Sequence, residues 1–446
     1  MKRWIVGVLS KLRPSKQLGP GSSKDSGQQE VKARDPETEP TSKSVSTRTE
    51  SKVALLIGFD FGTHSTKVVI RRRGVRQGRL LALDRAAEGY PSFAVPSVVR
   101  VLNGTLCFGT EALRQNSGTL YRFLKLELIR KSGTTSIDCE NTDLLVTAYF
   151  AWVLNSVKGW IDTEYGIANT KLFLNVAAPM DHFEDDEIKA RYLRLLGTAW
   201  EWVFDDPAKN VVQYVSEADL KSWMGGTRLT IPESETRVYD VLPETIAPIM
   251  SLSQDPRMTP GIYLLVDMGA GTTEMSVNYV PAPGTEEAVL CYFDRSTTIG
   301  AEQFLNGQDR EQLKSAVLTH LWQTWCYGFK KDGQNQAAKQ RWKSLSILLL
   351  GGGTCRPDVC DAIKGEKHAV YSRFPQEAKC QIMRHGPANL HCDGLQLSPQ
   401  DLSLASVANG LAFPRMQWLE FYEPAEVEAI GSTAVQKARE PWFFDR

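Results

Sequence analysis

The 446 residues of this chain exceed what a single hydrophobic core usually serves, so the length predicts two lobes. Lysine plus arginine and aspartate plus glutamate both number 52, a balance that argues against nucleic acid as a partner. The 8 cysteines are too sparse for a disulfide-stapled secreted domain, and no apolar run approaches the ~18 to 20 residues of a membrane-spanning helix. These features predict a cytoplasmic protein.

Residues 1–51 are predicted to form a disordered basic N-terminal tether. Beyond Pro14 this segment has almost no large apolar side chain, so ordering it would bury too little surface to offset the lost entropy. Residues 1–16 mix large apolar side chains with Lys and Arg, a pattern typical of a short helix at a membrane interface. Peripheral membrane contact through residues 1–16 is one interpretation, and a frayed terminus without function is the other.

The core begins with two apolar strands that flank a turn of small residues. In GFDFGTHSTKV, residues 58–68, Asp60 ends the first strand, and the turn contains Gly62, Thr63, His64 and Ser65. Such a turn directs backbone N–H groups at phosphate oxygens, hydroxyls add donors, and a strand-end Asp holds a hydrated divalent cation. The alternative is a plain chain reversal capped by the Asp. His64 either donates to a phosphate, which would raise the pKa of its imidazole, or packs within the turn.

The same design recurs later in the chain. In LLVDMGAGTTEMSV, residues 264–277, Asp267 ends the strand and the turn contains Gly269, Ala270, Gly271, Thr272 and Thr273. A third apolar strand, in SILLLGGGTCRPDV, residues 346–359, ends in Gly351, Gly352 and Gly353. One Gly-Thr turn is weak evidence, because most such turns only reverse the chain. Two copies followed by a glycine-ended strand predict a phosphate clamp made twice.

Strand and helix patterns alternate between these motifs and predict an α/β fold. Strands are predicted at residues 53–59, 67–71, 171–176, 263–267, 275–279 and 346–350, and helices at 142–157, 186–204 and 311–329.

The order of the three motifs is similar to the phosphate-1, phosphate-2 and adenosine motifs of the actin-like ATPase superfamily. Further segments resemble the 70-kDa heat-shock chaperone branch in a diverged form: VPSVVRVLNGTLCFGTEAL (95–113), KLFLNVAAPM (171–180), DVLPETIAPIMS (240–251) and RSTTIGAEQFLNG (295–307). The resemblance covers roughly residues 52–421 in the family's order. It extends to the nucleotide-binding domain only.

The resemblance implies a two-lobed actin-like (ribonuclease-H-like) ATPase fold with the nucleotide in the cleft between the lobes. Lobe I would comprise residues 52–258 and lobe II residues 259–402. Residues 403–421 would form a closing helix that returns to lobe I, and residues 422–446 a C-terminal tail.

The resemblance also implies roles for individual residues. Asp60 and Asp267 would hold Mg²⁺ beside the phosphates of ATP, and the two turns would bind those phosphates. Glu244 matches the family's water-positioning Glu, and Lys125 in FLKLEL matches its catalytic Lys, although a Lys in an amphipathic stretch is usually a solvated residue. Together with Asp267, these two residues are the predicted catalytic groups. Gly300 and the glycines at 351–353, with Arg356, would surround the nucleoside.

Several departures from the family bear on turnover. The family's Ser is Gly353 here, its adenine-stacking Arg is Cys355 with Arg356 one place later, and the outer subdomain before residue 346 looks truncated. The 25 residues after 421 are too few for a β-sandwich peptide-binding domain. We therefore expect an ATP-binding, chaperone-like protein with slow Mg-dependent hydrolysis and an unknown client or co-chaperone as its partner. The alternatives are a regulatory or scaffold module that binds nucleotide without hydrolysing it, and an actin-like filament protein.

Overall fold

Strands and helices alternate along the chain, which confirms the predicted α/β class. The computed structural model describes residues 52–129, 139–179, 186–206, 209–226, 238–282, 289–302, 319–320, 323–329, 344–357, 379–384, 386–414 and 419–421. The predicted tether at 1–51, the predicted tail at 422–446 and most of the predicted helix at 311–329 lie outside the described residues. Residues 51–446 form one compact unit.

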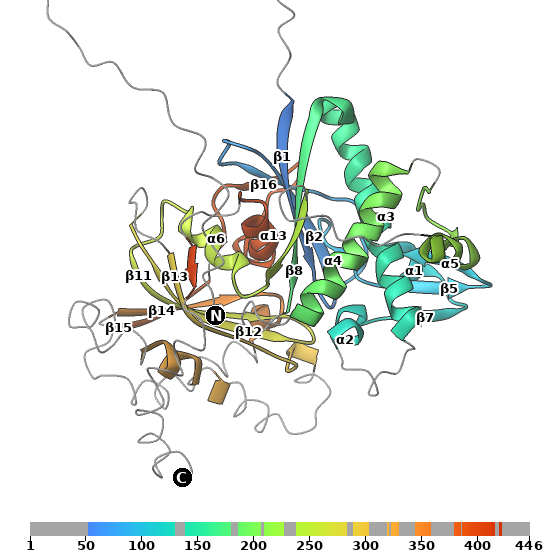
Figure 1. Cartoon of the computed structure of the whole chain (residues 1–446). Coiled ribbons are helices and arrows are strands. Elements are labelled where there is room, and N and C mark those ends of the chain that lie inside the picture. Colours follow the sequence, from blue (N-terminus) through green and yellow to red (C-terminus); the bar gives the residue numbers. More distant parts are fainter. Residues whose placement is uncertain are drawn as a thin grey trace, which may run out of the picture. The chain divides into compact units, whose positions relative to one another are not determined.

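The first sheet has seven strands in the order β10-β8-β1-β2-β3-β16, with β4 paired to β2 beside this path (Figure 1). The strands are β1 (Val53–Phe61), β2 (Ser65–Arg72), β3 (Gly78–Leu80), β4 (Val95–Pro96), β8 (Thr170–Ala178), β10 (Tyr239–Pro243) and β16 (Leu390–Cys392). Strands β1, β2 and β3 are antiparallel neighbours. Strand β8 runs parallel to β1, β10 parallel to β8, and β16 parallel to β3.

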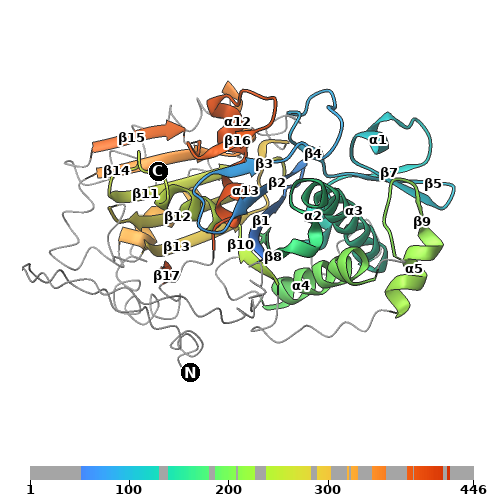
Figure 2. The ribbon, with the colours of Figure 1, turned by 90° about the horizontal axis from the view of Figure 1, so that it is seen from above.

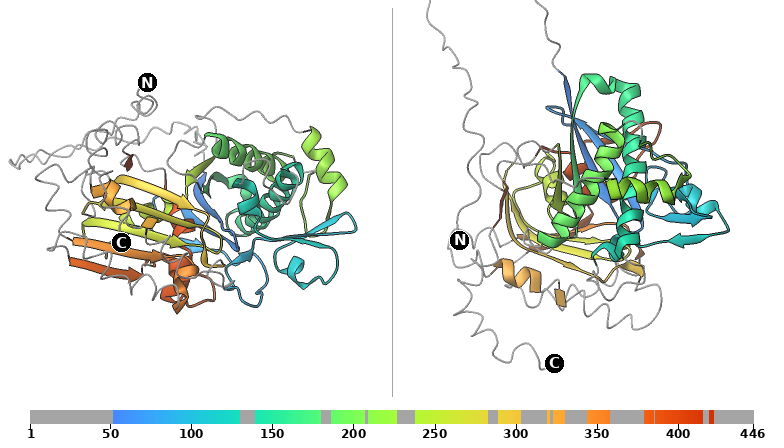
Figure 3. Two further views of the ribbon diagram at one scale, coloured as in Figure 1. Left: turned by 90° about the horizontal axis from the view of Figure 1, so that it is seen from below. Right: turned by 45° about the vertical axis from the view of Figure 1, so that its right-hand side comes forward.

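The second sheet has six strands in the order β15-β14-β11-β12-β13-β17. They are β11 (Gly261–Met268), β12 (Thr273–Val280), β13 (Val289–Thr297), β14 (Ser344–Leu350), β15 (Lys379–Arg384) and β17 (Leu419–Phe421). Strands β11, β12 and β13 are antiparallel neighbours. Strand β14 runs parallel to β11, β15 parallel to β14, and β17 parallel to β13 (Figure 3).

The two sheets share one topology. When β4 is left aside and the remaining strands of each sheet are numbered in chain order, the spatial order in both sheets is 5-4-1-2-3, strand 2 is antiparallel, and a sixth strand joins parallel to strand 3. The first hairpins also share a register, since Asp60 lies opposite Lys67 and Asp267 lies opposite Glu274. The duplicated hairpins of the sequence are therefore equivalent elements of two equivalent sheets.

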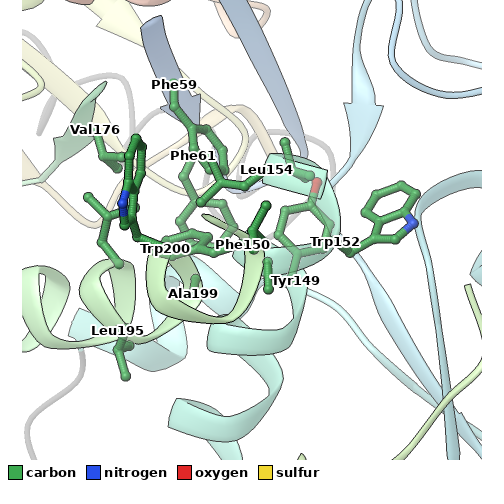
Figure 4. Packing of buried hydrophobic residues seen from close by; sticks show 14 of the residues in the cluster. Phe59, Phe61, Tyr149, Phe150, Trp152, Leu154, Val176, Leu195, Ala199 and Trp200 are labelled. Atoms are coloured by element: carbon green, nitrogen blue, oxygen red, sulfur yellow. The ribbon is translucent and has the colours of Figure 1, made fainter. Parts of the chain in front are cut away.

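Helices α3 (Cys139–Tyr165) and α4 (Asp186–Trp200) lie beside the first sheet (Figure 2). Phe59 and Phe61 of β1 point at Phe150 of α3, with ring centroids 5.3 and 4.9 Å from it in edge-on contacts (Figure 4). Such pairs add to the apolar burial of the largest core cluster. Within the described part of the chain, one stretch, Asn141–Tyr165 of α3, is long and apolar enough to cross a membrane, and it is mostly buried, as expected of a core helix.

A third, four-stranded sheet of order β7-β5-β6-β9 is inserted into the first half of the chain. Its elements are β5 (Val99–Leu102), β6 (Thr105–Phe108), β7 (Thr119–Tyr121) and β9 (Val215–Ser216), followed closely by helices α1 (Gly109–Arg114) after β6, α2 (Leu124–Ile129) after β7 and α5 (Glu217–Gly226) after β9. Arg191 of α4 donates to the carbonyl oxygen of Leu128 at 2.6 Å and so ties the end of α2 to α4.

Helices α6 (Ala247–Ser253) and α13 (Ser406–Leu411) pack closely against each other. A Cβ at Gly410 would overlap the carbonyl oxygen of Ala247, and a Cβ at Gly58 of β1 would overlap that of Ala408. Asn409 of α13 donates to Ser251 of α6 at 2.7 Å. Glycine is thus required where α13 meets α6 and where it meets the first sheet.

The C-terminal part of the fold differs from the expectation in two respects. Residues 403–421 do not form one closing helix: α12 (Pro399–Leu404) begins earlier, because Ser398 and Asp401 form a capping box, α13 follows it, and β17 returns to the second sheet. The chain also rejoins the first sheet before residue 403, through β16. A three-residue edge strand such as β16 or β17 has too short a pattern to be found from sequence.

Candidate functional site

The first turn joins β1 to β2 and carries a buried ion pair. Asp60, only 3% exposed, accepts a hydrogen bond from Lys67 Nζ at 3.0 Å across the hairpin. Side chains two residues apart on a strand point to the same face, and cross-strand partners share that face. The Lys67 ammonium is therefore held beside the turn of Gly62, Thr63 and His64.

The first turn also contains a hydroxyl without a partner. Thr63 is 5% exposed, and its Oγ1 makes no hydrogen bond. A buried hydroxyl left unpaired costs about 1–3 kcal/mol, so this oxygen marks a position where a ligand group or water would be stabilised. A Cβ at Gly62 would overlap the carbonyl oxygen of Ser65, so the turn requires glycine there.

His64 stacks on Tyr90, with ring centroids 4.4 Å apart and planes 3° apart. Partial burial beneath that ring, together with the positive charges of Lys67 and Arg122, lowers the pKa of His64. His64 therefore packs against Tyr90, outside the turn, and phosphate donation remains a prediction.

The second turn joins β11 to β12 and is closed by a hydrogen bond from Gly269 N to Thr272 O at 2.9 Å. The backbone N–H groups of Ala301 and Glu302 donate to the carbonyl oxygens of Gly269 and Ala270, each at 2.9 Å. A Cβ at Gly300 would overlap the Ala270 carbonyl oxygen, which explains the glycine at this crossing. The hydroxyl of Thr273 donates to Ile299 O at 2.5 Å and is already committed to the protein.

The two turns meet. A Cβ on Gly271 of the second turn would lie 3.0 Å from Thr63 Cγ2 of the first turn and 2.6 Å from Leu126 Cδ1 of α2. Two sequence-distant hairpins and the helix that carries Lys125 therefore converge on one point. A larger residue at position 271 would require the Leu126 and Thr63 side chains to shift.

Lys125 and Glu244 form a buried ion pair beside these turns. Lys125 is 2% exposed and Glu244 5%, and Lys125 Nζ donates to both carboxylate oxygens of Glu244, to Oε2 at 2.5 Å. Burial alone would lower the pKa of Lys125, but the carboxylates of Glu244 and Glu274 outweigh it and raise that pKa. Lys125 therefore stays charged, and the alternative of a solvated lysine is wrong.

Negative charge exceeds positive charge in this cluster. Burial and the carboxylates of Glu244 and Asp60 raise the pKa of Asp267 to about 7. Burial, and then the charges of Glu244 and Asp267, raise the pKa of Glu274 well above its usual value, although Lys125 opposes this. Burial likewise raises the pKa of Glu244 despite Lys125. Four carboxylates thus share two ammonium groups, and protons make up the difference in the absence of another cation.

The third motif packs against the second turn. Gly351 has φ +76°, and a Cβ there would overlap the Asp267 carboxylate, so only glycine fits. A Cβ at Gly353 would lie 2.7 Å from Met268 Cγ. Gly352 faces Leu404 instead. Arg356 follows a short 3₁₀ turn (Gly353–Cys355), and its backbone N–H donates to the Gly353 carbonyl oxygen.

The donor set suits a hydrated cation rather than an all-protein cage. Among the described residues, no group of three or more His, Cys, Asp or Glu side chains is arranged to hold a metal ion. Magnesium keeps several waters and is typically held by one or two carboxylates plus phosphate oxygens. Asp60 and Asp267 supply two such carboxylates, and the surplus negative charge at Asp267 and Glu274 is the chemistry that a divalent cation would neutralise.

Two residues of this cluster were missed in the sequence, Lys67 and Glu274. Each is the seventh residue after the Asp of its hairpin and lies opposite that Asp. A charged residue inside an apolar strand at this repeated spacing is the signal that identifies them. No protein-family model matches the chain, and a search of the curated proteins finds no significant match.

Proposed function

We propose that this chain has the two-lobed actin-like (ribonuclease-H-like) fold and binds ATP with Mg²⁺ between the lobes, as a diverged relative of the 70-kDa heat-shock chaperone ATPase domain. The meeting of the two turns, at Gly271 and Thr63, carries the proposal, because the turns belong to equivalent Asp-ended hairpins of the two sheets. A unit duplicated in this way presents two small-residue turns to a single ligand. A triphosphate, with negative charge along its length, fits paired turns that offer N–H and hydroxyl donors.

Residues on both turns divide the binding tasks. Thr63 offers its unpaired hydroxyl, the backbone of residues 270–272 would offer N–H groups, and Lys67 supplies a positive charge. Asp60 and Asp267 would hold the hydrated Mg²⁺, which when bound neutralises phosphate charge. The third motif, packed on the second turn through Gly351 and Gly353, would lie beside the nucleoside.

Hydrolysis would depend on Glu244 and Lys125. Glu244 orients a water and accepts its proton only if a carboxylate oxygen is available. Burial raises the pKa of Glu244, but Lys125 donates to both oxygens in this arrangement, and its positive charge lowers that pKa and so makes the carboxylate a weaker base. A weaker base supports slow turnover, which would drive lobe motion for a client protein or co-chaperone. The same ion pair favours the second candidate function, a regulatory module that binds nucleotide without hydrolysing it.

Binding is tested by titration calorimetry of ATP with and without Mg²⁺. Asp267→Asn is expected to weaken Mg-ATP affinity by at least about tenfold and to change Mg-free affinity little, because the lost charge acts on the cation. Asp60→Asn is expected to act in the same direction but less, since Asp60 is already paired with Lys67. Asp219→Asn on the exposed side of α5 is the matched control. Unchanged Mg-ATP affinity in Asp267→Asn, or no binding by the wild type, would refute the assignment.

Single-turnover hydrolysis separates the two candidate functions. Glu244→Gln is expected to leave Mg-ATP affinity within about threefold of wild type while slowing hydrolysis about 100-fold or more, because water activation acts in the transition state. If the wild type binds Mg-ATP and neither protein hydrolyses it, the regulatory module is the correct function.

A further inference from the structure

The dipeptide Glu244–Thr245 connects the two sheets. It follows β10 directly, and the backbone N–H of Glu244 donates to Ala178 O at the end of β8, 2.9 Å away. Thr245, the next residue, hydrogen-bonds to the second sheet. Thr245 Oγ1 donates to Asp294 Oδ2 of β13 at 2.8 Å, and its carbonyl oxygen accepts from Ser276 Oγ of β12 at 3.4 Å.

These bonds lie in the protein interior, and a further buried side chain hydrogen-bonds to one of their members. Thr245, Ser276 and Asp294 are all buried, and Asn278 Nδ2 donates to Ser276 Oγ at 2.9 Å. A hydroxyl-to-carboxylate bond is charge-assisted and about twice as strong as one between neutral groups. Buried bonds of this kind hold one geometry, because no water replaces them when they break.

The hydrogen bonds of Glu244 itself join it to α2 and to the first sheet. Its carboxylate is bound by Lys125 of α2 and its backbone N–H by Ala178 of the first sheet. Thr245, one residue further on, hydrogen-bonds to both β12 and β13. A shift of the second sheet would therefore be transmitted to the Glu244 backbone through Thr245.

We propose that Thr245 is a positioning residue that ties the water-orienting Glu244 to the second sheet. The bond to Asp294 keeps the Glu244 carboxylate in register with the turn that carries Asp267, so a displacement between the sheets misplaces Glu244 and stops hydrolysis without releasing the nucleotide. This inference rests on the proposed function. A misplacement of about 1 Å costs on the order of 100-fold in rate, which makes such a link an effective control.

Three variants of Thr245 and its neighbour test the proposal. Thr245→Val, which keeps the shape and removes the hydroxyl, is expected to slow single-turnover hydrolysis about 10- to 100-fold with Mg-ATP affinity within about threefold of wild type. Thr245→Ser restores the hydroxyl and should restore the rate. In the Glu244→Gln background, Thr245→Val should slow hydrolysis no further, because both changes act through one carboxylate. Thr198→Val is the control. Like Thr245→Val it removes a buried threonine hydroxyl, but this hydroxyl donates to the Arg194 carbonyl oxygen within α4, at 2.9 Å.

Each other result decides the question. Equal losses of affinity and rate in Thr245→Val, or a further loss in the Glu244→Gln background, would overturn the positioning role. If the wild type binds no Mg-ATP, the proposed function fails by itself. The coupling between Thr245 and Glu244 is then measured by denaturant unfolding of the wild type, Thr245→Val, Glu244→Gln and the double variant. The midpoint shifts of Thr245→Val and Glu244→Gln should be non-additive if Thr245 holds Glu244 in place, and additive shifts would overturn the inference.

Discussion

Burial and the carboxylates of Glu244 and Asp60 raise the pKa of Asp267 to about 7. An isolated aspartate would be ionised throughout the physiological range. Here the carboxyl group is held among like charges, and a bound proton or cation would reduce the repulsion between them. The side chain proposed to bind magnesium is thus destabilising to the fold when the cation is absent, which links stability, pH and ligand.

Asp267→Asn should remove a pH dependence of stability. Without nucleotide or metal, the native carboxyl group keeps its proton up to about pH 7, whereas in the unfolded chain it ionises near 3.8. A raised native pKa gives stability that is present below about pH 4 and is lost as the pH rises through about 7, by at most about 4 kcal/mol. Urea unfolding between these limits should show a steeper decline in the wild type than in Asp267→Asn, which keeps only the decline due to Glu244 and Glu274. Parallel pH profiles would contradict the burial of this charge, and Asp219→Asn should follow the wild type.

Lys125→Met should be strongly destabilising because it leaves Glu244 buried without its partner. Removing one member of a buried pair typically costs about 3–5 kcal/mol, whereas replacing both by apolar residues is often neutral. The double variant Lys125→Met/Glu244→Leu should therefore recover most of the lost free energy of unfolding, measured in urea. A double variant as unstable as the sum of the single changes would show that the pair is not the source of the effect.

The two hairpins could be predicted from sequence because each combines an apolar run, an Asp and a turn of small residues within a few positions. The strands predicted at 53–59 and 263–267 lie within β1 and β11 for the same reason. Lys67 and Glu274 were missed although both lie seven residues after the Asp, because that spacing acquires its meaning from the cross-strand register that places them opposite Asp60 and Asp267. The burial of Lys125 could not be predicted either, because it depends on Glu244 from a distant turn. Contacts over long sequence separations leave no local pattern.

At the scale of elements, α13 approaches α6 and the first sheet more closely than ordinary side chains allow. Gly410→Ala would place a methyl group against the Ala247 backbone, which cannot rotate away, so the helices must separate. We expect a loss of about 1–3 kcal/mol in the free energy of unfolding. Gly159→Ala in α3 meets no atom within 4 Å and should instead stabilise by up to about 1 kcal/mol, because alanine favours helix. Equal effects of the two variants would show that α13 and α6 are not closely packed.

At the scale of the whole molecule, the duplicated topology concentrates charge where the two sheets approach. Each sheet contributes an Asp and a turn, the β10–α6 connection contributes Glu244, and α2 contributes Lys125. Residues from four separate parts of the chain thus share one buried cluster. Under the proposed function, this cluster would recognise phosphate and cation, whereas the third motif would have to recognise the base. Residues 303–318 and 330–343, between the second and third motifs, lie outside the described residues.

This division predicts weak ATP affinity with little discrimination against GTP. Gly351 and Gly353 pack against the second turn and carry no group that pairs with a purine edge, and Cys355 stands where the resembled family has its stacking Arg. Charge-assisted bonds to phosphate would supply most of the binding free energy, and a site with few groups for the base cannot reject an analogue strongly. GTP should displace labelled ATP with an affinity within about threefold of ATP itself, whereas AMP should not, because it lacks the outer phosphates. Cys355→Arg should tighten ATP and GTP alike, since stacking on a ring face does not read its edge. Failure of excess GTP to displace ATP would instead reveal an adenine pocket formed by residues beyond the turns described here.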